Sequence, residues 1–164
     1  MPRRCLLLLL AAALAAPAQK YNGPRPPKPD IVYLKHASDL LPTEMLEAKE
    51  EKKGDAITYA IEGANSSVST PLALPIFLIV SDKLPPESLE LYKLETRNGR
   101  REIAMGPKKP GKPIRVEITR LTNDKLWQLE VEDSLEPGEY SFSPGSNERQ
   151  GWKGSNQVFC FQVR

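Results

Sequence analysis

The stretch IRVEITRLTNDKLWQLEVE, residues Ile114–Glu132, is the clearest structural signal in the chain. Apolar residues occupy every second position on both sides of the polar turn Thr122-Asn123-Asp124. An alternation with a period of two is typical of a β-strand with one buried face, and a helix does not produce it. Two such runs separated by turn residues predict an antiparallel pair of strands.

The same kind of signal recurs along the chain. Asn98-Gly99 is the strongest short hairpin signal, and it lies between the apolar runs 89–96 and 101–105. Pro75–Val80 is continuously apolar, which predicts a central strand covered on both faces. Further strands are expected at 31–36, 57–61, 140–142 and 159–163. Short strands at such regular spacing predict an all-β fold, an antiparallel sandwich of about seven or eight strands.

The stretch 40–53 is compatible with two structures. Glu44–Lys53 has strong helix propensity, and Thr43 is a suitable N-cap. Against a helix, Gly54-Asp55 is a turn signal followed at once by alternating Ile57, Tyr59 and Ile61. The β-rich surroundings favour a hairpin with a charged outer strand.

The N-terminus predicts export. Arg3 and Arg4 precede the Leu/Ala run Leu6–Ala16, and small residues then lead to a cleavage site between Ala18 and Gln19. The run is too short to cross a ~30 Å hydrocarbon core as a helix. We therefore expect a signal peptide at 1–18, no transmembrane anchor in the mature chain, and a periplasmic, cell-envelope or secreted location.

The mature chain of 146 residues is expected to form one domain. Residues 19–30 are rich in proline and are expected to be a linker, followed by the β-domain at 31–164. Cleavage removes two arginines, which leaves 21 basic and 21 acidic residues. This balance gives no reason to expect nucleic acid as a partner.

Cysteine and histidine are scarce, and this restricts the chemistry. Cys160 is alone after cleavage, so the mature chain has no intramolecular disulfide. Its apolar surroundings favour a buried, inert thiol over a redox thiol or an intermolecular disulfide. His36 is the only histidine, so a multi-histidine metal site is impossible and a histidine-based triad would have to use it. We expect no cofactor, although an unrecognised pair of catalytic carboxylates stays open.

Two loops are candidate binding segments. The loop 106–113 is basic and stiffened by proline and glycine, with Lys108, Lys109 and Lys112, and it would suit an anionic glycan, a lipid headgroup or an acidic protein. The alternative is a solvated loop that protects a strand edge from aggregation. The loop 144–155 carries Trp152 beside Lys153 and near Arg149. Trp152 would stack on a sugar or anchor a protein partner, or else fold back to plug one end of the sandwich.

The closing segments carry a resemblance. Leu135–Phe142 (LEPGEYSF), followed by Phe159–Val163 (FCFQV), resembles the last strand pair of many immunoglobulin-like bacterial domains. The chain from Ile31 to Val163 is also similar to exported, uncharacterised bacterial proteins. The resemblance implies an immunoglobulin-like sandwich in which Tyr140 packs at a corner, and it implies no active site.

The function expected from these observations is a non-enzymatic interaction or accessory module of the cell envelope or extracellular space, with an envelope protein or a glycan as partner. Two alternatives stay open: a carbohydrate-binding module that uses the loop 144–155, and an enzyme with a carboxylate or His36 site.

Overall fold

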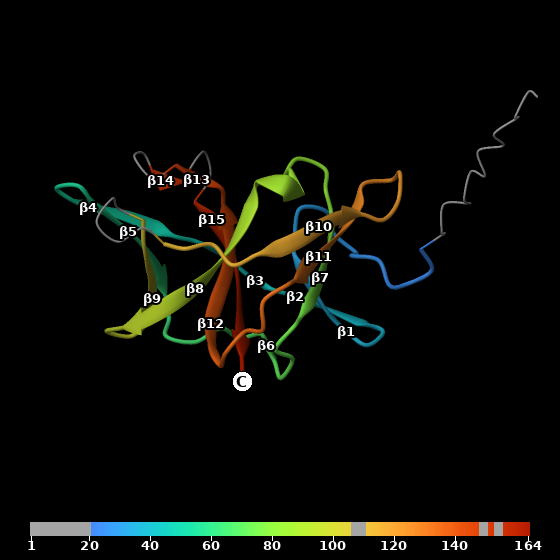
Figure 1. The fold of residues 1–164 in the computed structure, drawn as a ribbon, viewed down its shortest axis with the longest axis horizontal. Coiled ribbons are helices and arrows are strands. Elements are labelled where there is room, and N and C mark those ends of the chain that lie inside the picture. Colours follow the sequence, from blue (N-terminus) through green and yellow to red (C-terminus); the bar gives the residue numbers. More distant parts are fainter. Residues whose placement is uncertain (1–20, 106–110, 148–150, 153–155) are drawn as a thin grey trace, which may run out of the picture.

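The structure is a computed structural model that describes residues 21–105, 111–147, 151–152 and 156–164. In these residues the regular structure is β-strand, apart from one 3₁₀ turn at Pro86–Ser88 (Figure 1). No helix in this part of the chain is long and apolar enough to cross a membrane. The all-β fold predicted from the alternation is confirmed.

The strands form two large sheets. In chain order they are β1 (Tyr33–His36), β2 (Asp39–Pro42), β3 (Glu44–Glu47), β4 (Lys49–Lys53), β5 (Ala56–Glu62), β6 (Ser69–Thr70), β7 (Ile76–Val80), β8 (Leu89–Arg97), β9 (Arg100–Ala104), β10 (Val116–Arg120), β11 (Leu126–Val131), β12 (Gly138–Pro144), β13 (Ser146–Asn147), β14 (Gly151–Trp152) and β15 (Gln157–Val163).

The first sheet has five strands in the order β10-β11-β7-β1-β2. The second has the order β3-β15-β12-β8-β9-β5-β4, with β6 beside β15, and β13 pairs with β14 separately. Neighbouring strands run antiparallel except for β6 and β15. The two large sheets face each other across a first core that contains Phe77 from the five-stranded sheet and Phe142 and Phe161 from the second.

The predicted hairpins are present. β8 and β9 pair across Asn98 (φ 50°) and Gly99 (φ 74°), and positive φ at both positions is what a tight type I′ turn requires. β10 and β11 pair from Val116–Val131 to Arg120–Trp127. β7 is the middle strand of the five-stranded sheet, and its residues Phe77, Leu78 and Ile79 are all buried.

The hairpin alternative for 40–53 is confirmed, and the helix alternative is wrong. β4 pairs with β5 around Gly54, whose φ is 62°, and β3 pairs with β15. Helix propensity is a weak preference, and here the ladder hydrogen bonds to two neighbouring strands outweigh it.

The second sheet curls until its two ends meet. Its end strands β3 and β4 follow each other in the chain, with only the buried Ala48 between them. Ala48 N donates to Asn156 O at 2.9 Å, so the connection itself stays bonded to the segment that leads into β15. We call this closed arrangement the curled sheet. It encloses a second core, formed by Ala48, Ile57, Tyr59, Ile61, Tyr92, Leu94, Ile103, Met105, Val158 and Cys160.

The second core corrects the expectation for β12. The alternation of Tyr140 and Phe142 with polar residues predicts one buried and one solvated face. Tyr140 and Phe142 do face the first core, but Glu139, Ser141 and Ser143 are also buried, at 5%, 0% and 0% exposure. Their face is turned toward the inside of the curled sheet.

Candidate functional site

The segment 111–114 positions the one described lysine of the basic loop. Ile114 N donates to Leu91 O at 2.7 Å, which ties this segment to β8. Gly111 packs so closely that an added Cβ would lie 2.6 Å from Met105 Sδ. Lys112, between these two anchored residues, is exposed.

Two hollows lie on either side of Lys112. Both are lined by Lys112 and by Lys93 of β8, so the two lysines stand between them. The larger hollow, of about 320 Å³, is completed by Pro113, Ile114, Asp133, Ser134, Leu135, Glu136 and Tyr140. The smaller, of about 230 Å³, is completed by Tyr92, Glu95, Glu102, Ile103, Ala104 and Gly111.

The acidic groups of the larger hollow are already paired. Lys93 Nζ lies 2.8 Å from Glu136 Oε2, and this hydrogen bond lowers the pKa of Glu136 and raises that of Lys93. Arg115 Nη2 lies 2.8 Å from Asp133 Oδ1 and lowers the pKa of that carboxyl. Lys112 makes no ion pair with a described residue, although its charge contributes to the lowered pKa of Asp133. Its ammonium group is the available charge of the site.

The smaller hollow contains the carboxylate pair that sequence reasoning left open. Glu95 and Glu102 lie directly opposite each other on β8 and β9. Each is bound to an arginine: Arg97 Nη2 lies 2.9 Å from Glu95 Oε2, and Arg100 Nε lies 2.5 Å from Glu102 Oε1. Each of the two carboxylates is therefore engaged by an arginine of its own strand.

His36 lies apart from both hollows. It is exposed, at the end of β1, and is paired with Asp39 across a tight turn in which Ala37 has φ 54°. Within the described ranges, no group of three or more His, Cys, Asp or Glu side chains could hold a metal ion. The geometry therefore does not connect His36 with the carboxylates of the hollows.

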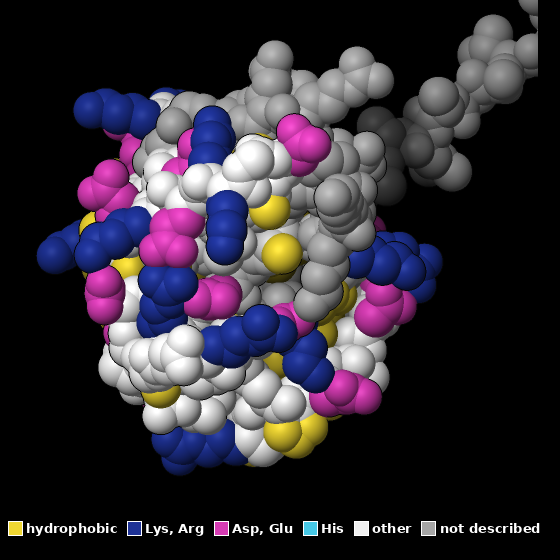
Figure 2. All heavy atoms as spheres, turned by 90° about the vertical axis from the view of Figure 1, so that its left-hand side faces the viewer, with side chains coloured by type: hydrophobic (Ala, Val, Ile, Leu, Met, Phe, Trp, Pro, Cys, Tyr) yellow, Lys and Arg dark blue, Asp and Glu magenta, His cyan; other side chains and the backbone are white. Residues whose placement is uncertain are grey.

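The face formed by β4, β5 and β9 offers a contrast to Lys112. Figure 2 shows basic and acidic side chains interspersed over the side of the molecule where these strands lie. Lys49 Nζ lies 2.8 Å from Glu62 Oε1, and Arg100 Nη1 lies 2.7 Å from Glu51 Oε1. This surface pairs its own charges, as expected for a solvated face.

The structure describes only part of the predicted binding residues. Lys108, Lys109, Arg149 and Lys153 lie outside the described residues, as do Ala18 and Gln19 of the cleavage site. The backbone of Trp152 lies in β14 opposite Ser146, and its side chain is outside the description. Lys112 is therefore the predicted binding residue whose side chain the structure describes.

Sequence reasoning missed Lys93. Lys93 lies opposite Tyr140 in the ladder between β8 and β12. Lys93 shares the parity of Leu89 and Leu91, which belong to the first core, so the alternation in β8 does not predict its exposure. The crossing of 111–114 beside β8 has no local sequence signal either.

Cys160 is buried at 0% exposure and is a free thiol. Burial raises the pKa of its thiol to about 12. A buried thiol that stays protonated is a poor nucleophile, which agrees with the predicted inert role.

An ionic cluster lies inside the curled sheet. Arg101 is fully buried, and its guanidinium donates to Glu44 Oε2 at 3.0 Å, Ser66 Oγ at 2.6 Å, and the carbonyls of Glu62 and Gly63 at 2.9 Å each. Glu139 Oε2 accepts from Ser66 N and Ser66 Oγ at 3.0 and 2.8 Å. Because Arg101 and Glu139 are closed to solvent, we interpret this cluster as structural.

Comparison with known proteins adds no family. No protein-family model, no curated protein and no solved structure matches the chain.

Proposed function

We propose that this protein is an exported, non-enzymatic interaction module that binds an acidic segment of a cell-envelope or extracellular protein at Lys112 and Lys93. The observation that carries the proposal is the position of the two lysines between two hollows, with the ammonium group of Lys112 unpaired by any described residue. An acidic side chain that enters either hollow would lie close to the ammonium group of Lys112. By sequence, Lys108 and Lys109 add positive charge to the same loop.

An interaction module is favoured over an enzyme by the state of the acidic groups. Glu95, Glu102, Asp133 and Glu136 line the hollows, and each is paired with a basic side chain. Among the described residues, these four carboxylates are therefore already engaged, and they give no support to a catalytic acid–base pair in the hollows.

Export and an immunoglobulin-like topology are parts of the same proposal. The arginine pair, the Leu/Ala run and the small residues before Gln19 support a cleaved signal peptide. The hydroxyl of Tyr140 donates to Glu136 O, four residues upstream, at 2.7 Å, which is the hydrogen bond of the tyrosine corner in immunoglobulin-like domains. N-terminal sequencing of the protein recovered from a bacterial periplasm should begin at Gln19, and an uncleaved chain would contradict export by this route.

The binding site is tested with a fluorescein-labelled poly-glutamate peptide, followed by fluorescence anisotropy at low salt. Lys112→Ala and Lys93→Ala should each weaken binding about two- to fivefold, the range expected for one exposed ion pair. Lys83→Ala is the matched control, because Lys83 is an exposed lysine beyond the end of β7 that pairs with Leu126, at the opposite end of β11 from Asp133. Equal binding by all three variants would overturn the proposed site.

A capture experiment identifies the class of partner. The mature chain is immobilised and exposed to an envelope extract, and retained material is compared between the wild type and Lys112→Ala. An acidic protein retained by the wild type alone supports the proposal. A neutral glycan whose retention is lost in Trp152→Ala would overturn it in favour of the carbohydrate-binding alternative.

A further inference from the structure

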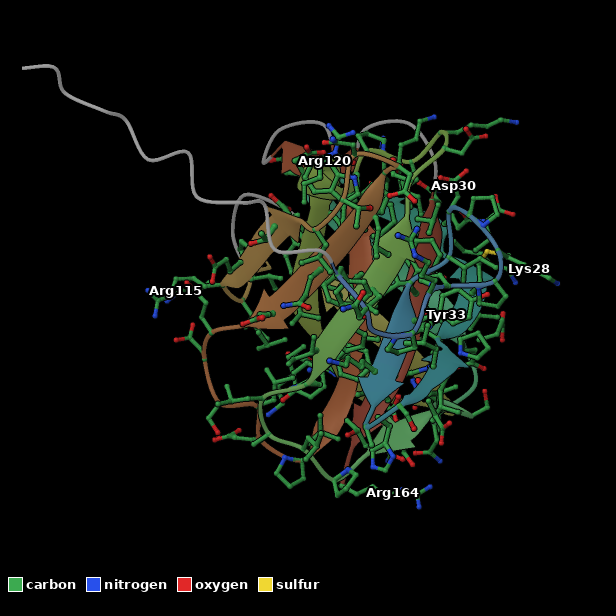
Figure 3. The ribbon with its side chains drawn as sticks, turned by 90° about the vertical axis from the view of Figure 1, so that its right-hand side faces the viewer. Lys28, Asp30, Tyr33, Arg115, Arg120 and Arg164 are labelled. Carbon is green, nitrogen blue, oxygen red and sulfur yellow. The ribbon has the colours of Figure 1, made fainter. Side chains whose placement is uncertain are left out.

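The proline-rich segment Tyr21–Asp30, which we call the strap, lies against the domain. Figure 3 shows it passing in front of the five-stranded sheet, from the side of β11 across β7 and β1 to Lys28 and Asp30. A linker that only separates two bodies would have no reason to pack in this way. The strap therefore marks the outer face of this sheet as a surface that holds an extended peptide.

The floor beneath the strap is apolar. Tyr33 and Leu78 lie directly opposite each other on β1 and β7. They alternate with Val32, Leu34, Phe77 and Ile79 of the first core, so they point to the outer face. Both are nevertheless buried, at 3% and 0% exposure. This buried outward pair lies on the face of the sheet that the strap crosses, which we call the strap face (Figure 3).

A proline and an arginine of the strap are held against the domain. Pro26 is buried, whereas Pro27, the next residue, is exposed. The guanidinium of Arg25 pairs with the carboxylate of Asp124, in the turn between β10 and β11. Tyr21 Oη donates to Pro24 O at 3.0 Å, which folds the start of the strap back on itself.

The other end of the strap is fixed by backbone hydrogen bonds. The carboxylate of Asp30 accepts from the N–H groups of Asp82, Lys83 and Leu84 at 2.8, 3.0 and 3.0 Å. Asp30 N donates to Val80 O at 2.8 Å. Because Asp30 is held in place, residues 21–29 form an arm with one fixed end, and the Arg25–Asp124 pair and the buried Pro26 also hold this arm against the domain.

These features match a known mode of peptide recognition. Proline-rich segments adopt the polyproline II conformation before binding, so they lose little entropy when they dock. Domains that bind such segments use aromatic side chains as the contact surface. Tyr33 supplies an aromatic ring on the strap face, and Asp124 supplies the carboxylate that pairs with Arg25, next to the buried Pro26.

We propose that the strap face, with Tyr33, Leu78 and Asp124, is a binding site for a polyproline II segment with an Arg-Pro step in another protein, and that the strap occupies this site in the same chain. A ligand must displace Arg25 and Pro26, so the strap lowers the apparent affinity in proportion to its occupancy. This site lies on the five-stranded sheet and does not rest on the function proposed for Lys112.

The test uses the full mature chain and a fluorescein-labelled peptide with the sequence YNGPRPPKPD, residues 21–30. The variant Arg25→Ala/Pro26→Ala weakens the binding of the strap to the domain and leaves Tyr33, Leu78 and Asp124 unchanged. This variant should bind the peptide about tenfold more tightly than the wild type, because its own strap no longer competes. Adding Asp124→Asn should remove most of the gain. If the double variant fails to fold, Arg25→Ala alone, which changes an exposed side chain, gives the same readout with a smaller shift.

Two matched peptides distinguish specific binding from non-specific binding. The peptide with Pro27→Ala should bind like the parent, because Pro27 is exposed in the strap, whereas the peptide with Pro26→Ala should lose about tenfold or more in affinity. The proposal is overturned if neither protein binds the peptide, if the wild type binds as tightly as the strap variant, or if both proline substitutions have the same effect. Sedimentation of the wild type then distinguishes a second copy of this chain from another protein as the ligand. Dimers that are lost in Pro26→Ala would identify a second copy and overturn the part of the proposal that names another protein. A monomeric wild type supports that part of the proposal.

Discussion

The two cores of this domain share strands β8 and β15, but they differ in kind. The first core is apolar and rich in aromatic rings, with centroids of Phe77 and Phe142 at 4.9 Å and those of Phe77 and Phe161 at 4.8 Å. The second core, on the other face of the same two strands, borders the buried ionic cluster of Arg101 and Glu139. One pair of strands therefore supports two forms of stabilisation.

The difference teaches what each core requires from its side chains. Contacts between rings and aliphatic groups depend on volume, so the first core tolerates similar shapes. A buried arginine is costly unless its partners are present. Glu139 is sensitive to the loss of its remaining bonds, because its Oε1 is buried without a hydrogen bond in the described residues. The ionic cluster also joins β9 to β3 and β12, so it fixes how the curled sheet closes.

The strongest way to break the comparison is Arg101→Met. This change removes the cation but leaves Glu139 buried, and we expect a loss of about 3–5 kcal/mol in the free energy of unfolding. Urea denaturation measures it. The double variant Arg101→Met/Glu139→Leu should recover more than half of the loss, because the unpaired carboxylate is removed too. A loss below about 1 kcal/mol in the single variant would show that the cluster is not a structural requirement.

A smaller effect should appear at high pH and only through the second core. Burial raises the pKa of the Cys160 thiol from its ordinary value of 9.0 to about 12. The unfolded chain therefore loses this proton first, so stability is complete below pH 9 and falls between pH 9 and 12. At one pH unit above the unfolded pKa the loss is about 1.4 kcal/mol. Comparing the pH dependence of unfolding with that of Cys160→Ala isolates the contribution, since the remaining titrating groups are common to both proteins. Parallel curves would contradict the assignment.

Where both cores are apolar they should respond alike. Ile79→Val in the first core and Ile61→Val in the second each delete one buried methylene at a side chain of 0% exposure. Each should cost about 0.5–1.5 kcal/mol. Thermal or urea unfolding of the pair provides the measurement, and a cost confined to one of the two would mean that one core is loosely packed.

An effect of similar size is expected at the edge of the first core. Tyr140→Phe removes the hydroxyl that donates to Glu136 O and should cost about 0.5–1.5 kcal/mol. The ring stays stacked near Phe161, so the core itself is unchanged. A loss in the free energy of unfolding as large as that expected for removing the whole ring would show that the hydroxyl also positions other parts of the first core.

Much of the strand structure could be predicted from the sequence because its signals are local. Asn98-Gly99 predicts the turn between β8 and β9, and alternation predicts β10, β11, β12 and β15. The closure of the curled sheet could not be predicted in this way, since β3 pairs with β15, more than a hundred residues later in the chain, whereas β4 pairs with the next strand, β5. Arg101 reads as one more surface cation, yet it shares the parity of Ile103 and Met105, and this pattern was the available signal for its burial.

The candidate site was predictable only in part. Lys112 belongs to a basic loop that is visible in the sequence, whereas Lys93 joins it through a crossing of segments that no local pattern describes. The strap is a similar case. Its prolines predict an extended segment, but the burial of Pro26 and the exposure of Pro27 follow from the sheet beneath them.

The position of β15 has a consequence for the order of folding. Phe159 and Phe161 of this last strand belong to the first core, and Val158 and Cys160 belong to the second. Its partner β3 lies more than a hundred residues earlier in the chain, so the contact that closes the curled sheet is among the most non-local in the molecule. Loop closure over such a distance is slow, and it cannot begin before residues 157–163 have left the ribosome. Neither core can therefore be complete while these residues are still inside the ribosome.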